Sequence, residues 1–320
     1  MRAALTMFLG LGLAIPCFGA DTYPIRPVRV VVPFAPGGTV DFTARVVSQQ
    51  LYEQLGTPFV VDNRTGATGT IANALVARSA PDGYTIMVAD PSLSIVPSLF
   101  KALPFDVNKD FTPITEIMRA PMVLVVNASS KATTIKELIA IAQQSPGKLN
   151  FGSGGTGSST HLPTELFAAA AKVNIVHVPY KGAGEALSAL LGGQVQMLIA
   201  TMPTALTQVK AGKLRALAVT TEGKRSTAMP DVPSMGEAGV AGMGVYLWFG
   251  FVGPAGVPRD VVTKLRNEVV KALGNPDVKQ RFEVQGAEVV GGTPEAFSKL
   301  IQSETRRWAS VIKTAGIKPE

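Results

Sequence analysis

The chain has 320 residues, with 30 basic and 23 acidic side chains, two histidines and one cysteine. This length is enough for two medium-sized domains. The basic residues are scattered singly and form none of the runs typical of nucleic-acid binding, so we expect no nucleic-acid partner. A net charge of +7 mildly favours small anionic ligands, and is equally compatible with ordinary solubility.

The first 20 residues, MRAALTMFLGLGLAIPCFGA, predict a secretory signal peptide. Arg2 supplies the charged start, residues 3–15 form an apolar stretch too short to cross a bilayer, and cleavage is expected between Ala20 and Asp21. Lipid attachment at Cys17 is the alternative, which the preceding proline disfavours. Cleavage would remove the only cysteine, so we expect a periplasmic protein without a disulfide. No later apolar run approaches ~18 residues, so we expect the mature chain to be soluble.

Strand-like and helix-like patterns then alternate along the chain. Strands are predicted at 28–34, 59–63, 84–90, 121–127, 173–180, 194–200 and 214–221, and helices at 40–55, 135–144, 185–193, 204–212, 261–273 and 294–312. Gly56 marks the end of the first helix, and Thr293 with Pro294 marks the start of the last. Because single helices separate the strands, the pattern predicts parallel α/β sheets.

The stretch LNFGSGGTGSSTHLPTEL, residues 149–166, contains G-x-G-x-x-G between a predicted strand and a helical pattern. This spacing is typical of a dinucleotide-binding turn, which requires an acidic residue at the end of the next strand. The strand here ends instead in Lys181-Gly182-Ala183-Gly184. We therefore expect no nicotinamide cofactor.

The residues of the chain give little support for a metal site or a catalytic nucleophile. Two histidines without a cysteine form no transition-metal spacing, so we expect no metal. His177 reads as a packed or surface strand residue, whereas His161 could cap a helix or contact a ligand. No G-x-S-x-G occurs, and the neighbouring Ser158, Ser159 and His161 do not by themselves make a triad. A secreted hydrolase acting on a small carboxylate or ester stays the alternative function, and a purely structural exported protein is a third.

Two Gly-rich turns suit anion binding. VVVPFAPGGTVD (30–41) and LNFGSGGTGSSTHL (149–162) each lead from a strand into a helix. Such turns present unpaired N–H groups at the positive end of a helix dipole. Glycine allows a positive φ, which we expect at Gly38, and a close approach of the ligand. Ordinary tight turns are the alternative, but two of them in one exported chain favour a binder of small organic anions.

Ordered motifs along almost the whole chain resemble one family. They are YPIRPVRVVVPFAPGGTVDFTAR, NRTGATGTIA, APDGYTI, NFGSGGTGSSTHL, VPYKGAGEAL, GKLRALAVTT, DVPSMGEAG, WFGFVGPAGVP and TPEAFSKLIQSETRRWASVIKTAGI. The chain is thereby similar, over residues 24–317, to the Bug family of periplasmic solute receptors of the tripartite tricarboxylate transporter system.

This resemblance implies a two-domain α/β fold of the periplasmic-binding-protein type II kind. Each domain would be a mixed or parallel sheet flanked by helices, with the ligand in the cleft between them. The first domain would comprise residues 21–124 plus 245–320, and the second residues 125–244. The implied protein is a monomeric, non-catalytic receptor without a cofactor. It would bind a small carboxylate and serve a membrane permease or a sensor.

The resemblance also implies a set of ligand contacts. They are Phe34, Ala35, Gly37, Gly38 and Thr39 in the first loop, Gly154, Thr156, Ser158 and His161 in the second, and Ser92 and Thr201 at the cleft edges. Relatives commonly carry acidic residues where this chain has Gln196 and Thr201. An acidic group at the cleft would select an amine, so Thr201 argues against an amino acid as the ligand.

Overall fold

The computed structural model describes residues 23–319, so the predicted signal peptide lies outside the described residues. The capping signals read from the sequence are confirmed. Helix α1 (Thr39–Leu55) ends at Gly56, whose φ of 68° is left-handed. The Thr293 side chain accepts a hydrogen bond from the Ala296 amide at 3.2 Å and so caps α10 (Pro294–Thr314).

Strands and helices alternate along most of the chain. The strands are β1 (Val28–Val32), β2 (Phe59–Asn63), β3 (Thr85–Ala89), β4 (Phe111–Asn127), β5 (Asn150–Ser153), β6 (Val176–Pro179), β7 (Met197–Thr201), β8 (Leu214–Val219), β9 (Tyr246–Pro254) and β10 (Glu288–Val289). The remaining helices are η2 (Ala67–Gly69), α2 (Thr70–Ala77), α3 (Pro91–Leu99), α4 (Ile135–Gln144), α5 (Leu162–Ala171), α6 (Ala183–Leu191), α7 (Met202–Lys210), α8 (Arg259–Leu273) and α9 (Pro276–Glu283).

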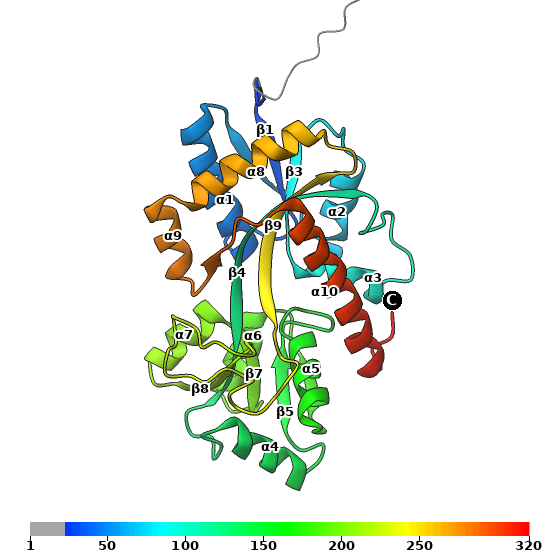
Figure 1. Ribbon diagram of the computed structural model, residues 1–320. Coiled ribbons are helices and arrows are strands. Elements are labelled where there is room, and N and C mark those ends of the chain that lie inside the picture. Colours follow the sequence, from blue (N-terminus) through cyan, green and yellow to red (C-terminus); the bar gives the residue numbers. More distant parts are fainter. Residues whose placement is uncertain (1–22, 320) are drawn as a thin grey trace, which may run out of the picture.

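The long strand β4 connects two lobes (Figure 1). Its residues up to Pro121 pair with β9, and those from Met122 onward pair with β7 and β8. The strands follow the order β2-β1-β3-β9-β4-β7-β5-β6. We call the part around β1–β3 and β9 the first lobe, with α1–α3 and α8–α10, and the part around β5–β8, with α4–α7, the second. The residue limits predicted for the two domains stay a prediction.

The sheet is mixed, which confirms the expected α/β fold with a mixed or parallel sheet, although the parallel pairing read from the alternating pattern holds for only some of the strands. Pairs β1–β2, β1–β3, β5–β6 and β5–β7 are parallel, as expected for strands joined through a helix. Strand β4 instead runs antiparallel to β7, β8, β9 and β10, and β9 runs antiparallel to β3. The predicted strand at 121–127 is only the second part of β4. Its first part contains Pro113 and polar residues that obscure the strand pattern, and the pairing register shifts there.

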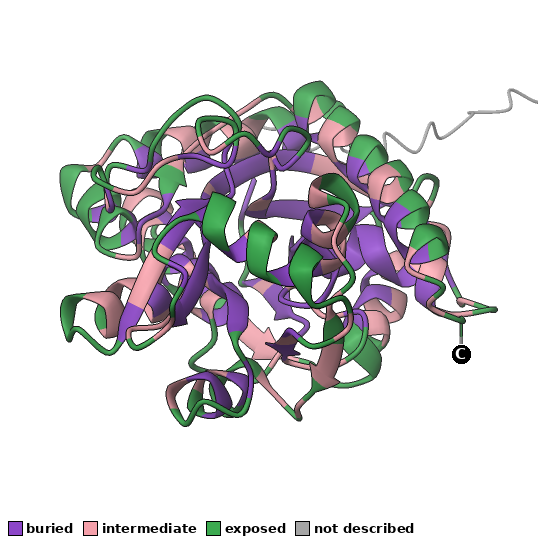
Figure 2. Cartoon of the chain, turned by 90° about the horizontal axis from the view of Figure 1, so that it is seen from below, coloured by how far each residue is buried: buried purple, intermediate pink, exposed green. Residues whose placement is uncertain are grey.

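Apolar packing follows the two faces of β4. Leu124 and Val126 join the largest core cluster, which extends into both lobes, whereas Val123 and Val125 point into a second cluster beneath α6 and α7. Figure 2 shows buried strands surrounded by helices with exposed outer faces. A smaller cluster joins the lobes through α3, α5 and α10, and it includes Trp308.

Within residues 23–319, none of the helices combines the length and apolar character needed to cross a bilayer.

Candidate functional site

The first Gly-rich loop leads from the end of β1 into helix α1. Ala35, Gly37 and Gly38 are exposed, and Phe34 and Thr39 are half-buried. Gly38 is the N-cap residue, and no side chain caps the helix there. The first-turn N–H groups of α1 are therefore the groups of this loop best suited to meet an anion.

Backbone angles correct one expectation about this loop. Gly38 has a φ of −78°, so the positive φ expected there is wrong. The positive angle belongs to Gly37, at 88°. Only the neighbouring Gly37 therefore requires glycine for its conformation, and Gly38 is favourable because it lacks a side chain that would cover the N–H groups.

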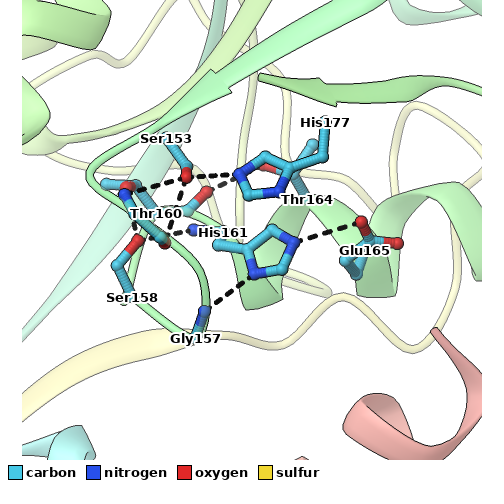
Figure 3. Close-up of polar contacts among 9 residues, drawn as sticks. Ser153, Gly157, Ser158, Thr160, His161, Thr164, Glu165 and His177 are labelled. Atoms are coloured by element: carbon cyan, nitrogen blue, oxygen red, sulfur yellow. Dashed lines mark hydrogen bonds and ion pairs between the residues drawn. The ribbon is translucent and has the colours of Figure 1, made fainter. Parts of the chain in front are cut away.

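The second loop, between β5 and α5, uses several of its donors internally (Figure 3). The Gly154 N–H donates to Thr160 Oγ1 at 2.9 Å, and the Gly157 N–H donates to His161 Nδ1 at 2.9 Å. Ser158 Oγ lies 3.2 Å from Thr160 Oγ1 and also accepts from the His161 N–H. These bonds shape the loop and leave Thr156 exposed at its tip.

Two histidines support this loop from beneath. The His161 and His177 rings are stacked with centroids 3.7 Å apart, and the Phe151 ring lies nearly parallel to both, 4.9 Å from His177 and 6.0 Å from His161. Because His161 Nδ1 accepts from the Gly157 N–H, its proton lies on Nε2, 3.2 Å from Glu165 Oε1. His161 thus caps the loop through its ring. His177 is a half-buried strand residue, as predicted.

The electrostatics of this stack favour a neutral His177. Burial, together with repulsion by His161, lowers the pKa of His177 to about 4, and Glu165 offsets this only in part.

A serine lies beside His177, which bears on the hydrolase alternative. Ser153 Oγ is 2.6 Å from His177 Nε2, within the distance required of a nucleophile and its base. Ser153 is, however, completely buried, and its one hydroxyl proton is donated to the Gly155 carbonyl, so His177 Nε2 donates to Ser153 Oγ and does not serve as its base. In this conformation the pair braces the second loop, and a substrate carbonyl has no access to the hydroxyl.

Ser92 lies near the first loop. A Cβ built on Gly69 would lie 3.4 Å from Ser92 Oγ and 3.9 Å from Phe34 Cζ, so these two predicted residues meet around Gly69. Ser92 Oγ donates to Asp90 Oδ1 at 2.6 Å, and burial raises the pKa of Asp90 to about 6. Asp90 is not among the predicted site residues, although it is the last residue of the predicted strand 84–90.

Thr201 takes a different place. It is the N-cap residue of α7, and its hydroxyl donates to Thr204 Oγ1 at 2.9 Å instead of to either loop. Met202, the next residue, packs against Gly286 of the first lobe.

The second loop also contacts the first lobe directly. A Cβ on Gly157 would overlap the Leu99 side chain of α3, so the absence of a side chain there allows the lobes to approach. Among residues 23–319, no group of three or more His, Cys, Asp or Glu side chains is arranged to hold a metal ion.

A family model and a related protein both match this chain over most of its length. The family model described as "Tripartite tricarboxylate transporter family receptor" matches residues 43–317. The chain is 39% identical to the protein BugT of Bordetella pertussis over 99% of this chain and 98% of that protein.

Solved structures show the same likeness. One is an R. palustris protein solved with adipate, with a TM-score of 0.82, 39% identity, and coverage of 93% of this chain and 100% of that one. Another is MatC from Rhodopseudomonas palustris with bound malate, with a TM-score of 0.78, 34% identity, and coverage of 91% and 100%. A third is the periplasmic binding protein BugD, with a TM-score of 0.78, 36% identity, and coverage of 93% and 100%.

Proposed function

Because the chain belongs to the tripartite tricarboxylate transporter receptor family, we propose that it captures a small organic dicarboxylate in the periplasm through its two Gly-rich loops. The observation that carries this proposal is the repeated strand–loop–helix arrangement. β1 leads through an exposed glycine turn into α1, and β5 leads into α5 through a second glycine turn, of which only Thr156 is exposed. The first lobe thus contributes a helix start whose N–H groups suit a carboxylate, and the second contributes a polar loop with Thr156 at its tip.

The chemistry of the loops favours an acid over a neutral or cationic ligand. The N–H groups at the start of α1 are donors without a side-chain cap, and the second loop adds the exposed Thr156 and the Ser158 hydroxyl. Donors of this kind match the acceptor oxygens of a carboxylate and leave nothing for an ammonium group. The uncharged Thr201 agrees with a ligand that lacks an amine.

The ligands found in similar structures suggest a size range for the ligand of this chain. Adipate and malate are both dicarboxylates, of six and four carbons, and each was found in a structure similar to this one. We infer that this chain takes a dicarboxylate in this size range. Delivery to a permease of the transporter, or reporting to a sensor, would follow binding.

Binding without catalysis agrees with the burial of Ser153, the serine placed next to His177. A hydrolase would need that hydroxyl to reach its substrate.

Calorimetry with a series of dicarboxylates from four to six carbons tests the proposal. We expect one or more of them to bind, and the monoamide of the best ligand to bind far more weakly because its NH₂ group would face N–H donors. Mass spectrometry of ligand released from freshly purified, denatured protein identifies the natural compound. Equal affinity for acid and amide, or hydrolysis of an ester panel, would contradict the proposal.

A further inference from the structure

A hydrogen-bonded unit centred on the buried Asp41 lies beneath the first loop. Asp41 is 3% exposed. Its Oδ2 accepts from the Gly37 N–H at 3.0 Å and from Arg45 Nε at 2.9 Å, and its Oδ1 accepts from Asn63 Nδ2 at 3.0 Å. The same Asn63 amide donates to the Phe34 carbonyl at 2.9 Å. We call Asp41, Arg45 and Asn63 the Asp41 clamp.

The clamp fixes the loop at two points three residues apart. The first point is the Phe34 carbonyl, which accepts a hydrogen bond from Asn63 of β2. The second is the Gly37 N–H, which donates to Asp41 of α1. Gly37 has a left-handed φ of 88°, and its bond to Asp41 stabilises this turn. The exposed part of the loop therefore rests on a rigid base.

The clamp also determines which backbone N–H groups of the loop are available to a ligand. The Gly37 N–H already meets a carboxylate of the protein, so it has no donor capacity left for a ligand. The groups that follow, the N–H groups of Gly38, Thr39 and Val40, begin the helix and remain for the ligand. This division revises the role expected of Gly37 from a contact to a turn residue.

The positive charge of Arg45 affects the carboxylate of Asp41 and the field at the start of α1. Burial raises the pKa of Asp41, but hydrogen bonds from Arg45, Gly37 and Asn63 outweigh it, so the pKa lies below its ordinary value and the group is ionised at neutral pH. A negative charge in the first turn of α1 would repel a carboxylate bound at the same helix end. The Arg45 guanidinium, 54% exposed, is positioned to offset that charge.

We propose that Asp41 is the positioning residue of the first anion-binding loop, and that Arg45 screens its charge from the bound carboxylate. This inference rests on the proposed function, because it assumes that the helix end binds an anion. Neither residue touches the ligand in this arrangement.

A charge-rescue experiment tests the screening. Calorimetry with adipate and malate compares wild type, Arg45→Gln, the double variant Arg45→Gln/Asp41→Asn, and Arg64→Gln. Arg64 is the matched control, because it is 50% exposed and pairs with Asp62 outside the clamp. We expect Arg45→Gln to weaken binding about fivefold at low salt, with a smaller loss at high salt. The control should bind like wild type.

The double variant distinguishes charge screening by Arg45 from a purely structural role of this residue. Removing the Asp41 charge should restore part of the affinity lost in Arg45→Gln, whereas a purely structural unit would lose still more with the second substitution. Similar melting temperatures would show that the variants are folded. Binding by Arg45→Gln equal to wild type, or a double variant weaker than Arg45→Gln, would overturn the screening by Arg45; the positioning by Asp41 is tested separately.

Amide hydrogen exchange measured by NMR tests the positioning without any ligand. The Gly37 amide should be protected in the free wild-type protein and lose that protection in Asp41→Ala, while amides of the central strands stay protected. A Gly37 amide that exchanges as fast as that of exposed Ala35 in wild type would refute the clamp. If wild type binds no dicarboxylate but Gly37 is protected, the proposed function fails and the positioning of the loop stands.

Discussion

The rings of His161 and His177 lie nearly parallel, at 16°, with their centroids 3.7 Å apart. One ring follows the second Gly-rich loop and the other comes from strand β6, so the stack ties the loop to the edge of the sheet (Figure 3). Both rings also hold loop atoms, His161 through the Gly157 N–H and His177 through Ser153 Oγ. The loop geometry therefore depends on both imidazole rings.

We expect His177 to make stability depend on pH. Its pKa is about 4 in the folded protein against 6.5 as the ordinary value, so between these values the unfolded chain binds more protons. The stability contributed by neutral His177 is complete above pH 6.5 and is lost as the pH falls toward 4, by roughly 1–2 kcal/mol after solvent screening. Chemical unfolding of wild type and His177→Gln from pH 4 to 8 measures the difference. A difference that does not change with pH would contradict this expectation.

Asp90 should make the stability depend on pH in the opposite direction to His177. Burial raises its pKa from 3.8 to about 6, so the folded state binds more protons in that window and stability is lost as the pH rises through 6. Asp90→Asn keeps an oxygen for the Ser92 hydroxyl and removes the buried charge. We expect it to raise the free energy of unfolding at pH 8, by about 3 kcal/mol at most, and to have little effect at pH 4. A variant less stable than wild type at pH 8 would show that the charge is compensated.

Backbone obstruction should harm binding more than loss of a hydroxyl. A Cβ at Gly38 would meet only the Ala35 carbonyl, at 3.8 Å, so Gly38→Val should fold normally while its methyl groups cover the first-turn N–H groups. We expect it to abolish measurable binding of a carboxylate. Ser158→Ala should cost roughly 0.5–1.5 kcal/mol, or up to ~3 with a charged partner. Calorimetry on both variants checks this, and unchanged binding by Gly38→Val would show that the carboxylate lies elsewhere.

Processing of the N-terminus is a separate prediction. The charged start and apolar stretch of the first 20 residues lead us to expect a mature chain that begins near Asp21, without a lipid anchor. The intact mass of protein recovered from a periplasmic fraction measures this directly. Recovery of a membrane-bound form acylated at Cys17 would contradict it.

Local patterns were enough to place many of the helices and strands. The spacing of apolar residues located α1, and Thr293 with Pro294 located the start of α10, because a cap is decided by a few neighbouring residues. The two Gly-rich turns were also visible, since a strand, a glycine cluster and a helix follow one another in the chain. The ordered motifs identified the family.

Contacts distant in sequence were decided only by the tertiary structure. Nothing near His177 in the sequence indicates that it stacks on His161, and nothing near Asn63 indicates that its amide holds the Phe34 carbonyl. The antiparallel course of β4 was hidden because strand direction depends on which partner the folded chain supplies. Whether a glycine N–H faces the solvent or a protein acceptor likewise depends on the side chains folded against it. For that reason the sequence could identify the two Gly-rich loops, whereas only the fold showed which of their N–H groups are bonded within the protein.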